Sequence, residues 1–165
     1  MITLVLGGTR SGKSDVAEGL AARSGPPVTY VATGRAVDAD MAARIAAHRA
    51  RRPAAWTTVE AGADLPDVLR DVAGPVLVDS LGTWVAGHDD LDPAIAPLCA
   101  ALRERAGDTV VVSEEVGLGV HAPSEAGRRF ADVLGTLNRA VADVADRVLL
   151  VVAGRVLPLE RVEGD

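Results

Sequence analysis

Short apolar runs alternate along the chain with stretches in which apolar residues recur every three or four positions. The runs are rich in β-branched residues and too short to be buried helices, so each predicts a strand. Strands are expected at Ile2–Leu6, Val28–Ala32, Val76–Asp79, Thr109–Ser113 and Val148–Val152. The first of them has the composition of a central strand that is buried on both faces. Strands that alternate with helices in this way are typical of parallel βαβ units.

The helical stretches are bounded by capping and breaking residues. Helices are expected from about Gly12 to the breaker Gly25–Pro27, from Asp38 or Asp40 to about Arg52, from Asp64 through Val72, over Ala94–Ala106, and along the apolar stripe Phe130, Leu134, Leu137, Val141 and Val144. Asp38 or Asp40 and Asp64 are predicted N-caps, because a short carboxylate side chain accepts hydrogen bonds from the first free N–H groups of a helix. Pro53 is expected to end the second helix.

The C-terminal segment predicts a hairpin at the edge of the sheet. Gly154 allows a tight reversal after Val148–Val152, so Arg155–Leu159 can pair antiparallel with that strand. Pro158 cannot donate to a sheet ladder and is tolerated only in an edge strand. We therefore expect an α/β protein, with a mostly parallel sheet covered by helices and an antiparallel C-terminal edge hairpin. At 165 residues, the chain has the size of a single domain, 1–165.

The composition mainly argues against certain classes of protein. Hydrophobic residues make up 48% and charged residues 24%, as in an ordinary globular domain. The net charge of −6 and the small number of aromatic residues argue against nucleic acid as a partner. The longest apolar run, Val148–Ala153, is too short to cross a membrane, and Gly7 and Gly8 come too early for a signal peptide, so the expected location is the cytoplasm. The lone Cys99 cannot form an internal disulfide, and we expect it in the core.

One stretch has the pattern of a phosphate-binding loop. Gly7-Gly8-Thr9-Arg10-Ser11-Gly12-Lys13-Ser14 fits G-x-x-x-x-G-K-[ST] without a gap, between a predicted strand and a predicted helix. Its glycines let backbone N–H groups curl toward phosphate oxygens, which also face the positive end of the following helix. Lys13, the only lysine among 17 cationic side chains, would reach the β- and γ-phosphates. The Ser14 hydroxyl would bind Mg²⁺. The motif predicts a P-loop NTPase-like fold.

A nucleotide site of this kind also needs an acidic residue near the metal, at the end of a neighbouring strand. Asp79 is the best candidate, because it follows the apolar run Val76-Leu77-Val78. Glu114 and Glu115 form a second acidic tip, which belongs at the same edge because parallel strands present their C-terminal ends together. Either tip could serve. Acidic residues at strand ends are also common as helix caps or solvated loop residues.

His48 has an unusual setting in the predicted second helix. Arg44, Arg51 and Arg52 lie three or four residues from it and share one helix face. Guanidinium groups disfavour a protonated imidazole, so a neutral, nucleophilic histidine beside a phosphate-binding arginine cluster is one interpretation. The alternative is a surface helix whose charges are solvated. His88 and His121 have no comparable setting.

These residues resemble a known family, the bifunctional adenosylcobinamide kinase/adenosylcobinamide-phosphate guanylyltransferases of cobalamin biosynthesis. The similarity is collinear over nearly the whole chain. Besides the P-loop, it rests on Tyr30-Val31-Ala32-Thr33-Gly34, Met41-Ala42-Ala43-Arg44-Ile45 with His48, Arg52-Pro53 with Trp56, Val78-Asp79-Ser80-Leu81, Glu115-Val116-Gly117-Leu118-Gly119, and Arg129-Phe130 with Asp132, Gly135 and Asn138. Gly82, Thr83 and Gly87 depart from the residues expected beside the acidic strand.

The resemblance implies two reactions on one substrate. A hydroxyl of adenosylcobinamide takes the γ-phosphate of ATP or GTP, with Lys13 and Mg²⁺ stabilising the developing charge. His48 then takes GMP from GTP and passes it to adenosylcobinamide phosphate, which gives adenosylcobinamide-GDP. Further nucleotide contacts are implied for Ala32, Thr33, Gly34, Arg49, Ala50, Arg51, Arg52, Glu60 and Asp79. Family members are homo-oligomers, trimers in the familiar case, with the corrinoid near a subunit interface.

Two alternative functions are also considered from the sequence. A plain small-molecule P-loop kinase would use Lys13, Ser14 and Asp79 but would have no use for His48. A regulatory GTPase normally recognises guanine with an N-K-x-D segment, and a chain whose only lysine lies in the P-loop cannot supply one.

Overall fold

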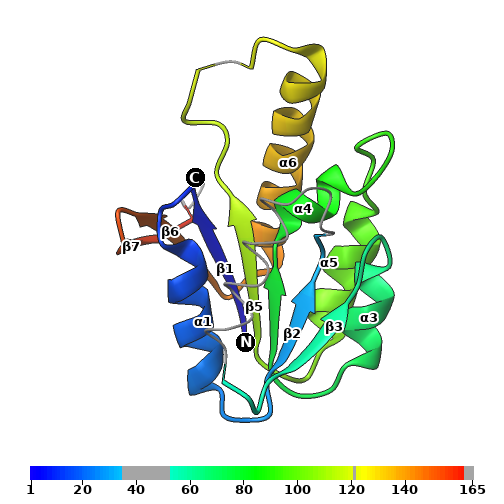
Figure 1. Cartoon of the computed structure of the whole chain (residues 1–165), viewed down its shortest axis with the longest axis vertical. Coiled ribbons are helices and arrows are strands. Elements are labelled where there is room, and N and C mark those ends of the chain that lie inside the picture. The colour runs from blue at the N-terminus through cyan, green and yellow to red at the C-terminus, as the bar shows by residue number, and fades with distance from the viewer. Residues whose placement is uncertain (35–52, 121, 162–165) are drawn as a thin grey trace.

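A computed structural model describes residues 1–34, 53–120 and 122–161. The described residues form a seven-stranded sheet with the order β3-β2-β4-β5-β1-β6-β7 (Figure 1). The strands are β1 Ile2–Gly7, β2 Thr29–Ala32, β3 Thr57–Glu60, β4 Val76–Asp79, β5 Thr109–Glu114, β6 Arg147–Val152 and β7 Arg155–Leu159. The first six pair parallel, whereas β7 runs antiparallel to β6 at the edge.

Helices cover both faces of the sheet. They are α1 Lys13–Arg23, α3 Leu65–Asp71, α4 Leu81–Ala86, α5 Ile95–Glu104 and α6 Glu125–Val144. In Figure 1, α1 lies on one side of the sheet, and α3, α5 and α6 lie on the other. Within the described residues, no helix has both the length and the apolar character that a membrane crossing requires.

The strands supply two hydrophobic cores because successive side chains point to opposite faces. In β1, Leu4 belongs to the core under α3 to α6, whereas Val5 belongs to the core under α1. In β4, Val78 and Leu77 divide in the same way. All four side chains are at most 1% exposed. This burial on both faces explains why the central strands are continuous apolar runs.

The predicted α/β class, the parallel sheet and the C-terminal hairpin are confirmed, and Pro158 lies in edge strand β7 as expected. The edge strand β3 and the short helix α4 were not predicted. The helix expected from Asp38 or Asp40 to Arg52 lies outside the described residues.

The predicted capping role of the Asp64 side chain is wrong. Asp64 does occupy the N-cap position of α3, but its side chain accepts no capping hydrogen bond. Pro66, in the first turn, has no N–H to donate, and the N–H of Asp67 donates to the backbone carbonyl of Asp64 instead. Side-chain caps are found on other helices: Ser80 caps α4 and Ser124 caps α6.

Candidate functional site

Most of the described residues that the sequence singled out lie at the C-terminal edge of the parallel strands. Strand register places Gly7 of β1 beside Glu114 of β5. It also places Ala32 of β2 between Asp79 of β4 and Glu60 of β3. The P-loop starts at this edge, at the end of β1, and leads into α1 (Figure 1). Ligands of open α/β sheets bind at this edge.

The P-loop is a tight curl that is braced by the C-terminal hairpin. The Ser11 N–H donates to the carbonyl of Gly8 at 3.2 Å, and the Gly154 N–H donates to the carbonyl of Ser11 at 2.8 Å. Gly12 has φ 91°, and a Cβ at this position would lie 3.3 Å from Cα of Gly154. Only glycine combines that backbone conformation with so close an approach. The turn after β6 therefore holds the loop from which Lys13 and α1 begin.

Lys13 is paired with Glu114 across the sheet edge. Its Nζ lies 3.7 Å from Oε1 of Glu114, and the two side chains are only 13% and 27% exposed. From this position, the Lys13 ammonium can form charge-assisted hydrogen bonds with an oxyanion that binds to the loop. Lys13 and Glu114, a residue of one of the two candidate acidic tips, therefore both lie at this edge of the sheet.

Glu114 is in turn held by the start of α4. Ser80 Oγ donates to Oε1 at 2.9 Å and lies 3.1 Å from Oε2, and the Gly82 N–H donates to Oε2 at 3.0 Å. A Cβ on Gly82 would overlap Oε2 of Glu114. The backbone carbonyl of Glu114 accepts a hydrogen bond from Asn138 Nδ2 at 3.0 Å, and Ser113 Oγ donates to Asn138 Oδ1. Both ends of the glutamate are thus fixed.

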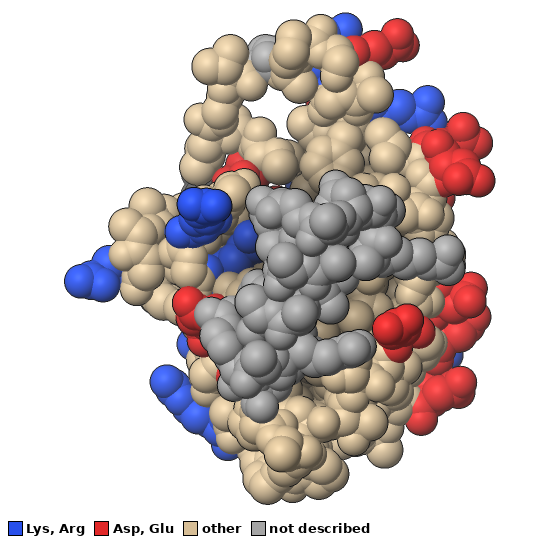
Figure 2. Space-filling model, in the orientation of Figure 1, with Lys and Arg blue, Asp and Glu red and all other residues tan. Residues whose placement is uncertain are grey.

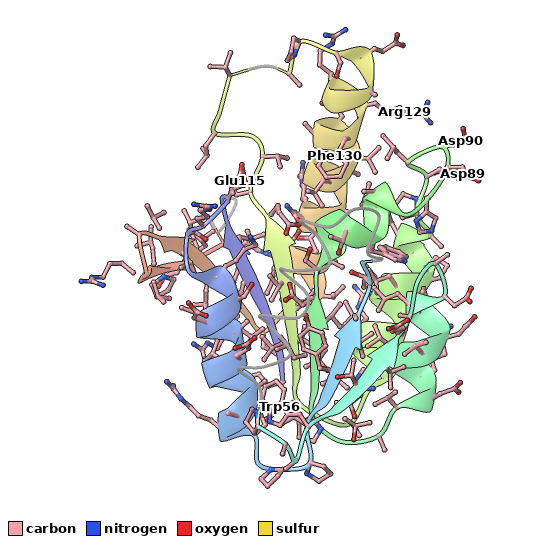
Figure 3. The ribbon with its side chains drawn as sticks, in the orientation of Figure 1. Trp56, Asp89, Asp90, Glu115, Arg129 and Phe130 are labelled. Carbon is pink, nitrogen blue, oxygen red and sulfur yellow. The ribbon has the colours of Figure 1, made fainter. Side chains whose placement is uncertain are left out.

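The neighbouring acidic residues have different settings. Asp79 accepts a hydrogen bond from the hydroxyl of the buried Tyr30, at 2.9 Å, on Oδ2. Glu115 accepts from the N–H of Gly117 within its own turn. Figure 3 shows Glu115 just beyond the end of β5, where the chain leaves for α6. The carboxylates of Asp79 and Glu114 are therefore anchored to the sheet edge, whereas that of Glu115 is engaged in a local turn.

Thr33 connects the end of β2 to the start of α4. Its hydroxyl donates to the Ser80 carbonyl at 2.6 Å, accepts from the Ser80 N–H at 3.0 Å, and lies 2.6 Å from Thr83 Oγ1. The side chain is 3% exposed. A nucleotide contact from this position would therefore come from the backbone, because the hydroxyl is already engaged.

The structure brings most of the predicted site residues together. Those at or next to the edge are Gly7, Gly8, Thr9, Arg10, Ser11, Gly12, Lys13, Ser14, Ala32, Thr33, Gly34, Glu60 and Asp79. His48, Arg49, Ala50, Arg51 and Arg52 lie outside the described residues. Trp56 is not part of this edge: it packs on the α1-side core, and Figure 3 places it toward the opposite end of the sheet from Glu115.

The donor set at this edge fits a magnesium ion that is bound mainly through a nucleotide. Ser14, in the first turn of α1, and Asp79 offer the hard oxygen atoms that Mg²⁺ prefers. Across the described residues, no group of three or more His, Cys, Asp or Glu side chains could hold a metal by itself. A site that relies on one or two protein oxygens together with phosphates and water needs no such group.

The chain is similar in sequence to a known protein family over nearly its whole length. Residues 3–159 match the family model described as cobinamide kinase / cobinamide phosphate guanyltransferase, CobU. The chain belongs to this family. It is similar to the bifunctional adenosylcobalamin biosynthesis protein CobP of Pseudomonas aeruginosa, at 45% identity over 97% of this chain and 98% of that protein. The CobU proteins of Salmonella typhimurium and Escherichia coli are 35% and 36% identical, each over 93% of this chain and 97% of the relative.

The chain is thus a bifunctional kinase and guanylyltransferase of the CobU family, as the sequence predicted. A solved ATPase of a bacterial type III secretion system shares the fold, with a TM-score of 0.54 at 10% identity, over 90% of this chain and 50% of that one. At that identity the likeness concerns only the fold, and it agrees with the P-loop architecture.

Three contacts at this site were not predicted from the sequence. Ser80 and Gly82 hold the Glu114 carboxylate, Asn138 holds its backbone, and Gly154 braces the P-loop. The spacing of Ser80 and Thr83 is that of a helix cap, which was a usable signal for the start of α4. Gly82 stood out only as a departure from the residues usual in the family.

Proposed function

We propose that the CobU-family chain phosphorylates adenosylcobinamide at the P-loop edge. The terminal hydroxyl of adenosylcobinamide attacks the γ-phosphate of ATP or GTP, and the product is adenosylcobinamide phosphate. Backbone N–H groups from Gly7 to Ser14 cradle the triphosphate, and Lys13 stabilises charge on the β- and γ-phosphates as the bond breaks. The remaining proposed nucleotide contacts come from Ala32 to Gly34, Arg49 to Arg52, Glu60 and Asp79.

We further propose that guanylyl transfer uses the same triphosphate site. His48 attacks the α-phosphate of GTP, a P–N bond forms, and pyrophosphate leaves. The phosphate of adenosylcobinamide phosphate then attacks the histidine-linked GMP, which frees His48 and yields adenosylcobinamide-GDP. Two chemically similar steps on one substrate can thus share one set of phosphate-binding groups.

The observation that supports this proposal best is the position of Lys13. It stands at the start of α1, paired with Glu114, at the edge where Asp79 also ends its strand. Such a cation at the mouth of a curled glycine loop is suited to the oxygens of a triphosphate. A second cation is proposed here too: Mg²⁺ held by Ser14 and Asp79, which would neutralise phosphate charge when bound.

The assembly and location follow the family. We propose a homo-oligomer, a trimer by resemblance, that binds adenosylcobinamide and adenosylcobinamide phosphate and acts in the cytoplasm, where nucleoside triphosphates are available. The apolar side chains exposed on β7 and on the loop after β5 are compatible with contacts between copies. They include Leu118, Val120, Val156 and Leu157.

The covalent intermediate gives the sharpest test of the proposal. The chain is incubated with GTP and Mg²⁺ without corrinoid, and then digested and analysed by mass spectrometry. We expect a GMP adduct on the peptide that contains His48, and none in His48→Ala. His88→Ala is the matched control and should keep the adduct, because His88 lies just past the end of α4, where its Nδ1 is 2.9 Å from the carbonyl of Trp84. An adduct that survives in His48→Ala would exclude the proposed nucleophile.

A further inference from the structure

The Glu114 carboxylate occupies the place of an anion beside the P-loop lysine. Its Oε1 lies 3.7 Å from Nζ of Lys13, within ion-pair range but beyond the length of a hydrogen bond. Its hydrogen bonds come from elsewhere, from Ser80 and from the N–H of Gly82. Of the contacts described for this carboxylate, the one with Lys13 is therefore the one that can be exchanged without breaking a hydrogen bond.

Glu114 is also unable to follow the lysine. Ser80 and Gly82 fix its carboxylate to the start of α4, and Asn138 fixes its backbone to α6. Glycine at position 82 leaves room for this carboxylate, which a Cβ there would overlap. When Lys13 turns toward another partner, its ion pair with Glu114 therefore breaks, because the glutamate stays in place.

Solvent does little to screen the attraction between Lys13 and Glu114. The lysine side chain is 13% exposed and the glutamate side chain 27% exposed. Charges that are largely removed from water are screened by salt much less than surface pairs are. An incoming triphosphate must therefore draw Lys13 away from a carboxylate that is largely removed from water.

We propose that Glu114 sets the affinity for the nucleoside triphosphate by competing with its phosphates for Lys13. This rests on the proposed function, in which Lys13 binds the β- and γ-phosphates. Glu114 is thus a positioning residue that acts through Lys13. Such competition lowers ground-state affinity for the nucleotide and keeps Lys13 at the site between turnovers.

The test is a double-mutant cycle on nucleotide binding. A fluorescent, nonhydrolysable GTP analogue is titrated into the full chain, the Glu114→Gln and Lys13→Gln variants, and the double variant, each with Mg²⁺ and with EDTA. Glu114→Gln should bind the analogue about three- to tenfold more tightly, the range expected when a partly buried ion pair no longer opposes binding. Lys13→Gln should bind it more weakly. In the Lys13→Gln background, Glu114→Gln should not change the affinity for the analogue, because there is no longer a lysine for which carboxylate and phosphate compete.

Two further variants keep the test decisive. Glu114→Asp withdraws the charge by one methylene and should shift affinity in the same direction by less, which covers the case in which the glutamine variant does not fold. Glu104→Gln is the control, because it removes an exposed carboxylate on α5 that pairs with Arg70 of α3, and it should leave affinity unchanged.

Four results would overturn the proposal. Weaker or unchanged binding in Glu114→Gln would exclude competition, and weakening confined to Mg²⁺ conditions would make Glu114 a metal ligand instead. An equal tightening in the Lys13→Gln background would show simple repulsion of phosphate by the carboxylate. If Lys13→Gln itself bound the analogue normally, the phosphate-binding role of Lys13 in the proposed function would fail, and the competition with it.

Discussion

At the scale of single residues, Gly82 and Glu114 depend on each other. The N–H of Gly82 donates to Oε2 of Glu114, and a Cβ at position 82 would overlap the same oxygen. The atom that must move is the end of a side chain, so a larger residue displaces the carboxylate and leaves the backbone in place. Alanine at this position therefore removes hydrogen bonds to a charged group.

Gly82→Ala should lower the free energy of unfolding by about 1–3 kcal/mol, the usual loss when hydrogen bonds to a partly buried charge are broken. Urea denaturation followed by circular dichroism measures it. Gly19→Ala is the matched control: Gly19 lies inside α1 with open space around its Cβ position, so alanine should stabilise the chain by about 0.5–1 kcal/mol. In a Glu114→Ala background the penalty at Gly82 should largely disappear. An undiminished penalty there would mean that the conflict does not involve the carboxylate.

The sequence could predict the residues of a local motif, but it could not predict their partners. Lys13 and Ser14 follow from the P-loop pattern, and Asp79 follows from its position after an apolar run. Glu114 remained one of two alternatives because its partner Ser80 lies 34 residues away. That pairing depends on the register between β4 and β5, which no local pattern specifies.

At the scale of elements, Arg105 joins α3 to the start of β5. Its guanidinium donates to the carbonyls of Leu69, Val72 and Gly74, and its Nε donates to Thr109 Oγ1. These carbonyls lie at or after the C-terminal end of α3, where the helix leaves acceptors without partners of its own. Burial lowers the pKa of the Arg105 guanidinium, which nevertheless stays charged at neutral pH.

Arg105→Ala should lower the free energy of unfolding by about 2–3 kcal/mol, because it leaves several carbonyls without a donor. Nucleotide affinity should stay unchanged, since Thr109 begins β5 whereas the P-loop lies beyond the opposite ends of the strands. Thermal unfolding and analogue titration measure the two effects. Arg103→Ala removes an exposed arginine from the last turn of α5, which ends just before Arg105, and should change stability by less than about 0.5 kcal/mol. A large loss of nucleotide binding in Arg105→Ala would contradict this separation.

Cys99 on α5 should be an unreactive thiol in the folded chain. It is 9% exposed, and burial raises its pKa above the ordinary value. Because the thiolate is the reactive form, the raised pKa leaves less of it at pH 7 to 8, and the rate should climb only at higher pH. Reaction with iodoacetamide should be slow in buffer and fast in urea, and should follow unfolding. Labelling at the unfolded rate in buffer would refute this placement.

The missed elements are those with weak patterns. Thr57–Glu60 forms the edge strand β3, in which every side chain is exposed or half-buried, so its sequence lacks the apolar run of a central strand. Helix α4 has six residues and includes Gly82 and Thr83, both poor helix formers. It is therefore too short for a helical period of apolar residues to be recognised in the sequence. The interior strands were predicted well because burial on both faces demands continuous apolar residues.

At the scale of the molecule, the two cores hold the sheet so that the candidate functional residues lie at one of its edges. Strand alternation divides side chains between the α1 side and the α3 to α6 side, and the ends of β1, β2, β4 and β5 then meet. Figure 2 shows acidic side chains along the right-hand flank, which is the flank of α3 and α5 in Figure 1. The predicted class was correct, but the strand order, and with it the neighbour of each strand end, needed the structure.

The central claim is that one phosphate site, organised by Lys13, serves both reactions. It is tested by incubating adenosylcobinamide, or adenosylcobinamide phosphate, with GTP and Mg²⁺ and identifying the products by mass spectrometry. The wild-type chain should form the phosphate and then adenosylcobinamide-GDP, and His48→Ala should stop at the phosphate. Lys13→Ala should slow both steps by about 10²–10³-fold, as expected when a group that stabilises transition-state charge is lost. Guanylyl transfer to adenosylcobinamide phosphate at the wild-type rate in Lys13→Ala would contradict the claim.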